Sequence, residues 1–322
     1  MMSKEELMQQ ASKLDYKPEI YEKVLNLLLV LEQLVSVPYL KDRLVLKGGT
    51  ALNLFHFEPI PRLSVDIDLN YFGHIDREIM LQEKPVINEA MIQILQQNQF
   101  ERDRIPNRHA GAKTIWRYVS ALGQVGNLEI DLNYMYRKPL WPIIELEPKM
   151  LSGSAFKVPV LDIHELAAGK FSALFSRKVS RDFFDAHFLL TNCKLDRKKL
   201  RESFIIYAGF SDTPLDNLSV DSIDYDIFDI RNKLFPVLKQ KNISRKKLDI
   251  EKWANQLRNE LNEKMLSLLP LQQTEIEFIR MLREQGEVRP ELITEDKNLI
   301  EAVLDHPLIK WKALQSTNQD QV

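Results

Sequence analysis

The chain contains a single cysteine, Cys193, in 322 residues. One cysteine excludes an internal disulfide and fits a protein of a reducing compartment. Long apolar runs are also missing: the run Leu27–Leu31 is followed by Glu32 and is far too short to cross a bilayer. The N-terminus carries Glu5 and Glu6 where a signal peptide needs positive charge. We therefore expect a soluble, cytoplasmic protein with no membrane partner.

A strong net charge is missing as well, because 44 Lys and Arg residues stand against 46 Asp and Glu residues. A global basic excess is thus excluded as the means of holding a nucleic acid, and such a partner would need a local patch. Basic residues cluster at Lys194–Arg201 and at Lys239–Lys247. Clusters of this kind are more often solvated helix faces, so phosphate contact and plain solvation both stay open.

The most informative stretch is residues 44–70, LVLKGGTALNLFHFEPIPRLSVDIDLN. Its second half alternates Arg62, Ser64, Asp66 and Asp68 with apolar residues, which predicts a strand with one wet and one buried face. The two aspartates then project from the same side, where they repel each other by roughly 3 kcal/mol at a dielectric of about 20. Water, a neighbouring Lys or Arg, or Mg²⁺, which takes one or two carboxylates as ligands, can relieve this repulsion.

A glycine pair lies between the apolar run and a helix-like segment of the same stretch. Gly48 and Gly49 let the backbone approach a phosphate closely, and the helix start that follows at Thr50 offers unpaired N–H groups. Further along, two runs at residues 113–122 and 127–135 are joined by a glycine-containing turn, which predicts a hairpin. In the second run Glu129 and Asp131 share one face. On its own, this pattern fits a solvated strand face.

From Asp162 onward the pattern is helical. Asp162 and Glu165 have the spacing of a capping box at the start of a helix that carries Lys170. A second helix follows, RDFFDAHFLL, which opens with Arg181. Its acidic residues are Asp182 and Asp185. An Arg and an Asp four residues apart form an ordinary helix ion pair, and an aspartate near a helix start is favoured by the helix dipole, so a purely structural role is also open.

The order strand, G-G-T, helix, R-x-S-x-D-x-D resembles the nucleotidyltransferase superfamily that includes DNA polymerase β. It is more closely similar to the AbiEii/MenT family of type IV toxin–antitoxin systems, as is a lysine followed by R-D-x-x-D. The spacing between Gly49 and Asp66 is longer than in many superfamily members. The resemblance implies an α+β fold. A polymerase-β-like core with a mixed sheet and N-terminal helices would cover residues 1–160. A helical domain, residues 161–322, would complete the active site and bind the acceptor.

The same resemblance implies the chemistry of the site. A Mg-dependent enzyme would move a nucleoside monophosphate from an NTP to a hydroxyl and release pyrophosphate. Two Mg²⁺ ions would be held by Asp66, Asp68 and a third carboxylate, for which Asp131 is the best match and Glu129 the reserve. Lys170 and Asp185 would complete the catalytic set. The implied nucleotide-binding residues are Gly48, Gly49, Thr50, Arg62, Ser64, Lys170, Arg181 and Asp182. Arg62 would offset phosphate charge or brace Asp68.

The family also implies a biological role. In MenT-type toxins the acceptor is the 3′ end of tRNA, and extension of that end blocks aminoacylation. This chain would then be the toxin of a pair, with an AbiEi-like antitoxin as its partner. The alternatives are transfer to a hydroxyl of a small molecule or of a protein, and a nucleotide-binding module of the same fold without turnover.

Overall fold

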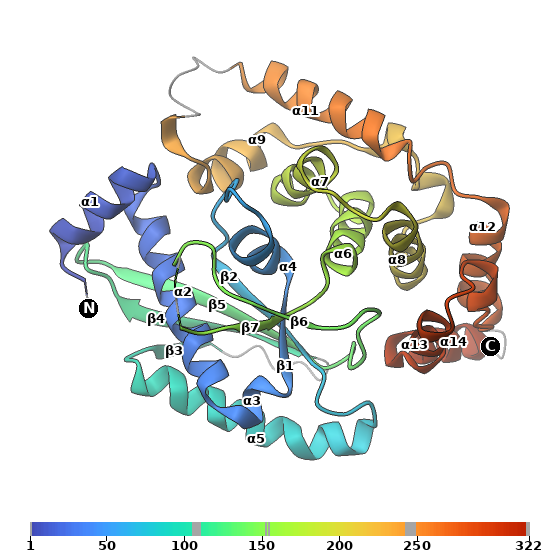
Figure 1. The fold of residues 1–322 in the computed structure, drawn as a ribbon, viewed down its shortest axis with the longest axis horizontal. Coiled ribbons are helices and arrows are strands. Elements are labelled where there is room, and N and C mark those ends of the chain that lie inside the picture. Colours follow the sequence, from blue (N-terminus) through green and yellow to red (C-terminus); the bar gives the residue numbers. More distant parts are fainter. Residues whose placement is uncertain (1, 105–110, 152, 154, 242–248, 320–322) are drawn as a thin grey trace. The chain divides into compact units, whose positions relative to one another are not determined.

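The structure is a computed structural model that describes residues 2–104, 111–151, 153, 155–241 and 249–319 (Figure 1). The chain divides into two compact units. Unit 1 contains Met1–Arg137, Ile143–Leu161 and Phe235–Leu248, and unit 2 contains Lys138–Pro142, Asp162–Leu234 and Asp249–Val322. In the part of the chain that is described, no helix is long and apolar enough to cross a membrane.

Unit 1 is built on a mixed sheet with the strand order β3-β4-β5-β2-β1-β7-β6. At its centre, β2 runs parallel to β5 and antiparallel to β1, while β1 runs parallel to β7. The mixed sheet with helices is the expected α+β core. The strands are β1 (Leu44–Lys47), β2 (Asp66–Tyr71), β3 (Glu101–Arg104), β4 (Gly111–Val119), β5 (Val125–Asn133), β6 (Ile144–Leu146) and β7 (Val158–Val160).

The helices of unit 1 follow local sequence signals. The first helix begins after Ser3, whose hydroxyl accepts from the Glu6 N–H while the Glu6 carboxylate accepts from the Ser3 N–H, which is a complete capping box. Proline occupies the first position of the next two helices. The helices are α1 (Lys4–Leu14), α2 (Pro18–Ser36), α3 (Pro38–Lys41), α4 (Gly48–Thr50), the π-helical turn Ala51–His56 that continues α4, and α5 (Arg77–Gln97).

A late segment of the chain belongs to unit 1. The Leu63 N–H donates to the Val237 carbonyl at 2.8 Å, and Arg62 forms a β-bridge with Leu238. The alternating pattern predicts a strand from Arg62, whereas β2 begins at Asp66. The difference has a physical cause, because residues 62 and 63 pair with this returning segment instead of with the strands of the sheet.

Unit 2 is helical, as expected for the second half of the chain. Its helices are α6 (Ile163–Ser176), α7 (Ser180–Asn192), α8 (Arg197–Phe210), α9 (Ile227–Asp229), α11 (Ile250–Met265), α12 (Gln273–Arg280), α13 (Lys297–Asp305) and α14 (Pro307–Gln319). Short 3₁₀ or π turns lie at Leu215–Asn217, Val220–Ser222, Ile230–Leu234, Met281–Gln285 and Pro290–Leu292. In unit 1, the returning segment forms one more such turn, Phe235–Val237.

The predicted capping box at the start of α6 is wrong in one half. Asp162 caps the helix by accepting from the His164 N–H at 2.9 Å. Glu165 instead turns into the core, where it is fully buried and accepts from the Leu140 N–H at 3.0 Å and from the Tyr207 hydroxyl at 3.2 Å. Burial raises the pKa of Glu165 to about 8, because two neutral donors only partly replace water around a carboxylate.

This buried carboxyl predicts a pH-dependent stability. The unfolded Glu165 loses its proton near pH 4.5, whereas the folded one keeps it up to about pH 8. The free energy of unfolding should therefore fall as pH rises through this window, by several kcal/mol at about 1.4 kcal/mol per pKa unit. Urea unfolding at about pH 5 and pH 8 should show this fall in wild type and a smaller one in Glu165→Gln. The exposed control Glu301→Gln should match wild type; a Glu165→Gln curve that matched it too would contradict the prediction.

Candidate active site

Four carboxylates share one face of the sheet where β2 and β5 run side by side. The parallel register pairs Asp66 with Glu129 and Asp68 with Asp131. Side chains of paired residues in a sheet point to the same face. All four carboxylate residues are half-buried, whereas Ile67 and the other residues between them are buried on the opposite face. The predicted alternation thus brings the carboxylates of the two strands together on the side away from this core.

Lysines flank these carboxylates on both sides. In the register of the sheet, Lys47 of β1 is paired with Asp68, and Lys113 of β4 is paired with Asp131. A row of two lysines around two aspartates therefore crosses four neighbouring strands. Lys113 also forms an ion pair with Glu129. The Glu129 carboxylate, and beyond it those of the two β2 aspartates, raise the pKa of the Lys113 ammonium.

The glycine of the loop after β1 is needed for two reasons. Gly48 has a φ of 72°, which residues with a side chain rarely adopt, and a Cβ at this position would overlap the Asp68 carboxylate. The loop is tied to β2 a second time, because the buried Thr50 hydroxyl donates to the Asp66 carbonyl. The predicted phosphate loop and the predicted metal ligands are thus in direct contact. With its hydroxyl engaged, Thr50 is better placed to hold the loop than to bind phosphate through its side chain.

Two other predicted nucleotide-binding residues are buried. Arg62 is 1% exposed and donates to the Leu63 carbonyl at 2.9 Å, and Ser64 is 4% exposed. A guanidinium so deeply enclosed is not accessible to a triphosphate in this conformation. Its hydrogen bond to the Leu63 carbonyl supports the segment that leads into β2. The alternative that Arg62 braces Asp68 stays a prediction.

The donor set of the face fits Mg²⁺. Asp66 and Asp68 offer hard carboxylate oxygens from one strand, and Mg²⁺ is commonly bound by one or two carboxylates together with water and substrate phosphates. Among the described residues, no group of three or more His, Cys, Asp or Glu side chains stands in an arrangement that would hold a metal ion. A third ligand from β5 stays a prediction.

Unit 2 carries a second charged cluster, centred on Lys170. Its ammonium lies 2.7 Å from Asp182 Oδ1 and 2.9 Å from Asp185 Oδ2. The side chains are 11%, 3% and 0% exposed, so each charge depends on the others for compensation. Arg177 adds a further ion pair to Asp182 at 2.8 Å. Burial opposes the charge of Asp182, but Lys170 and Arg177 outweigh it and hold the pKa of this carboxyl below its usual value.

The start of α7 is set by Asp229, whose carboxylate accepts from the Ser180 N–H at 2.8 Å and from the Ser180 hydroxyl at 2.6 Å. This places Asp182 and Asp185 on the first turns of α7, facing Lys170 of α6. Arg181, which precedes Asp182 in the sequence, is half-buried. Lys170, Asp182 and Asp185 are thus brought together within unit 2.

Sequence reasoning missed three members of these clusters, which are Lys47, Lys113 and Arg177. Lys113 could have been found from the hairpin register, which follows once the turn between β4 and β5 is located. Arg177 lies one turn after Ala173 at the end of α6, and its pairing with Asp182 depends on the bend between two helices. No local sequence pattern predicts this bend.

The basic clusters are partly used within the fold. Lys199 pairs with Asp162 at 2.7 Å, and Arg201 pairs with Glu275 through two nitrogens, at 2.5 and 2.8 Å. Two cations of the first cluster therefore serve packing. Of the second cluster, residues 242–248 lie outside the described residues.

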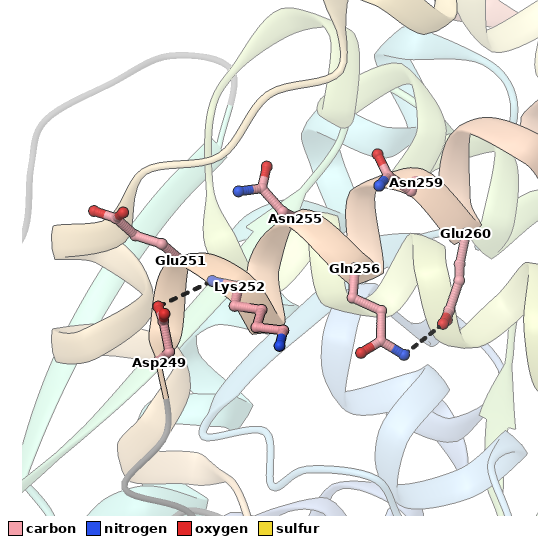
Figure 2. Close-up of a pocket in the computed structure, with 7 residues that line it drawn as sticks. All are labelled: Asp249, Glu251, Lys252, Asn255, Gln256, Asn259 and Glu260. Carbon is pink, nitrogen blue, oxygen red and sulfur yellow. Dashed lines mark hydrogen bonds between the residues drawn. The ribbon is translucent and has the colours of Figure 1, made fainter.

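A surface pocket also lies along α11 (Figure 2). Its lining is polar: Asp249, Glu251, Lys252, Asn255, Gln256, Asn259 and Glu260. Two internal hydrogen bonds, from the Lys252 N–H to Asp249 and from Gln256 to Glu260, occupy part of it (Figure 2). The lining contains none of the residues of the carboxylate face or of the Lys170 cluster, so we do not assign the transfer site to it.

No curated protein matches the chain. Among solved structures it is similar in fold to MenT4, a nucleotidyltransferase toxin from Mycobacterium tuberculosis H37Rv, at 17% identity and a TM-score of 0.57. The match covers 94% of this chain and 99% of MenT4. A family model described as nucleotidyl transferase AbiEii toxin, type IV TA system, matches residues 29–291. Since this match spans most of the sequence, the chain belongs to the AbiEii family of nucleotidyltransferase toxins of type IV toxin–antitoxin systems.

Proposed function

We propose that this protein transfers a nucleoside monophosphate from an NTP to a hydroxyl at the 3′ end of tRNA. The observation that carries the proposal is the contact of the Gly48 backbone with the Asp68 carboxylate on a face shared with Asp66 and Asp131. A polyphosphate bound at the loop would lie next to carboxylate oxygens that can bind its metal ion. The acceptor oxygen would attack the α-phosphorus, the bond to the β-phosphate oxygen would break, and pyrophosphate would leave.

Each group of unit 1 has a separate part in this scheme. Asp66, Asp68 and Asp131 would hold two Mg²⁺ ions, which when bound supply the charge that activates the acceptor and stabilises the leaving pyrophosphate. The backbone N–H groups of Gly48 and Gly49 would bind triphosphate oxygens. Glu129 would hold Lys113 in place as a counter-charge to the carboxylates, which leaves Asp131 as the third metal ligand.

Unit 2 would supply Lys170. Its ammonium can offset triphosphate charge, with Asp182 and Asp185 fixing its position through the two ion pairs. Asp185 can also orient Arg181 or accept a proton. The remaining exposed cations of the first basic cluster, Lys194, Arg197 and Lys198, would contact acceptor phosphates. An AbiEi-like antitoxin would be the cognate partner.

Loss of one carboxylate should abolish transfer. With total tRNA, Mg²⁺ and α-labelled NTPs, Asp68→Asn should lower labelling of RNA at least about 100-fold, because it removes a charged metal ligand. Asp42→Asn, at an exposed position of the same unit, should label like wild type. Label on small molecules or protein instead of RNA would assign a different acceptor. NTP binding without transfer to any acceptor would favour the module without turnover.

The two β5 carboxylates should differ in their effect. Asp131→Asn should lower transfer about 100-fold or more and shift the Mg²⁺ requirement to higher concentration, as expected for a metal ligand. Glu129→Gln leaves that ligand in place and removes only the ion pair with Lys113, so transfer should fall less than about tenfold. Titration of activity with Mg²⁺ for both variants distinguishes them. The reverse order would make Glu129 the ligand.

Lys170 should be required for toxicity. Lys170→Arg keeps the positive charge between Asp182 and Asp185 but replaces a compact ammonium by a planar group, so the protein should fold and yet transfer poorly. Induced expression of wild type should arrest growth, and Lys170→Arg should relieve the arrest at an equal level of soluble protein. Lys178→Arg, at an exposed ion pair, should stay toxic. If cells that contain soluble wild-type protein continue to grow, the prediction that the protein is toxic is contradicted.

A further inference from the structure

One buried polar side chain on the carboxylate face has no partner. Asn70 is 1% exposed, and neither its Oδ1 nor its Nδ2 has a hydrogen-bond partner among the described residues. A buried polar atom left without a hydrogen bond costs about 1–3 kcal/mol, and native proteins rarely leave one in that state. Asn70 lies two residues after Asp68 on β2, so both side chains point to the same face. The pairing atoms that Asn70 lacks must come from something other than these residues.

The neighbouring strand provides a direct comparison. Asn133 of β5 is the register partner of Asn70, and it carries the same side chain on the same face. Its Oδ1 accepts from the Met135 N–H at 2.7 Å and from the Tyr136 N–H at 3.4 Å, which holds the turn after β5. One asparagine of the pair therefore holds a turn, and the other has no hydrogen-bond partner among the residues that the structure describes.

The order of groups along β2 indicates what Asn70 meets. The Gly48–Thr50 loop contacts β2 at both Asp66 and Asp68, and Asn70 lies one further step of about 6.6 Å along the strand. If triphosphate oxygens lie at the loop and the α-phosphorus lies at the carboxylates, the sugar comes next. A carboxamide offers one acceptor and two donors, which suits a hydroxyl that both donates and accepts.

We propose that Asn70 binds a ribose hydroxyl, a role that rests on the proposed nucleotidyl transfer. The ribose belongs either to the incoming NTP or to the terminal nucleotide of the RNA acceptor. Asn70 is 1% exposed, so contact with a sugar requires a movement of the residues that enclose it.

The first arm of the experiment measures stability without ligand. Asn70→Leu removes two unsatisfied polar atoms at nearly constant volume, so the Tm should stay the same or rise by a few degrees. Asn133→Leu is the matched control, and its Tm should fall because the turn after β5 loses its acceptor. A Tm of Asn70→Leu that fell as far as that of Asn133→Leu would assign Asn70 a structural role and overturn the proposal.

The second arm measures sugar preference. Equilibrium binding of each of the four NTPs and of its 2′-deoxy form, with Mg²⁺, should show a preference of about tenfold or more for ribose in wild type and its loss in Asn70→Leu. The same comparison, made as transfer to RNA that ends in ribose or in 2′-deoxyribose, tests the acceptor. Loss of the ribose preference in NTP binding would assign Asn70 to the ribose of the NTP. Its loss in transfer to RNA would assign Asn70 to the terminal ribose of the acceptor.

The outcomes separate the two proposals. NTP binding with a sugar preference that survives in Asn70→Leu, or with no preference in either arm of wild type, overturns the role of Asn70 and leaves nucleotidyl transfer intact. Absence of NTP binding by wild-type protein overturns the proposed function together with the ribose assignment.

Discussion

Mutual repulsion among carboxylates is the constraint on which the carboxylate face of the sheet depends. The parallel register of β2 and β5 places four acidic side chains on one face of the sheet, where none can move far from its neighbours. The sheet accommodates them through compensation at both edges of the row, with Lys47 on β1 and Lys113 on β4. Carboxylate oxygens are hard ligands of the kind that Mg²⁺ takes, so the same face fits the proposed metal.

The charges around Lys170 in unit 2 are compensated differently from those on the sheet. On the sheet, charges are half-exposed and water shares the compensation, whereas around Lys170 the three charges are almost fully enclosed. In such surroundings the removal of one partner is costly, because the remaining charge is left without compensation. The two ion pairs therefore hold the Lys170 ammonium at a defined position, as its proposed role requires. Glu165 shows the other solution available to a buried acid, which is to remain protonated.

The sequence predicts the helices and strands of this protein better than it predicts which residues pair between them. Period-two alternation was sufficient to place Asp66 and Asp68 on one face, and the positions of the glycine pair and of Asp131 followed from strand patterns and the family resemblance. The ion pair of Lys113 with Glu129 follows from the hairpin register only once the turn between β4 and β5 is located. The lack of a partner for Asn70 among the described residues depends on tertiary packing, which no local sequence pattern predicts. The burial of Arg62 was unpredictable for a related reason, since its neighbour Leu63 pairs with Val237, far along the chain.

That returning segment has a consequence for synthesis on the ribosome. The Leu63 N–H, three residues before Asp66, finds its acceptor at Val237 only after about 170 further residues have been made. A nascent chain that has emerged no further than α7 already contains every acidic residue of the sheet but lacks the segment that pairs with residues 62 and 63. Unit 1 therefore completes its fold only after residues 162–234 of unit 2 have been made, and a product terminated before Val237 would carry the motif without this support.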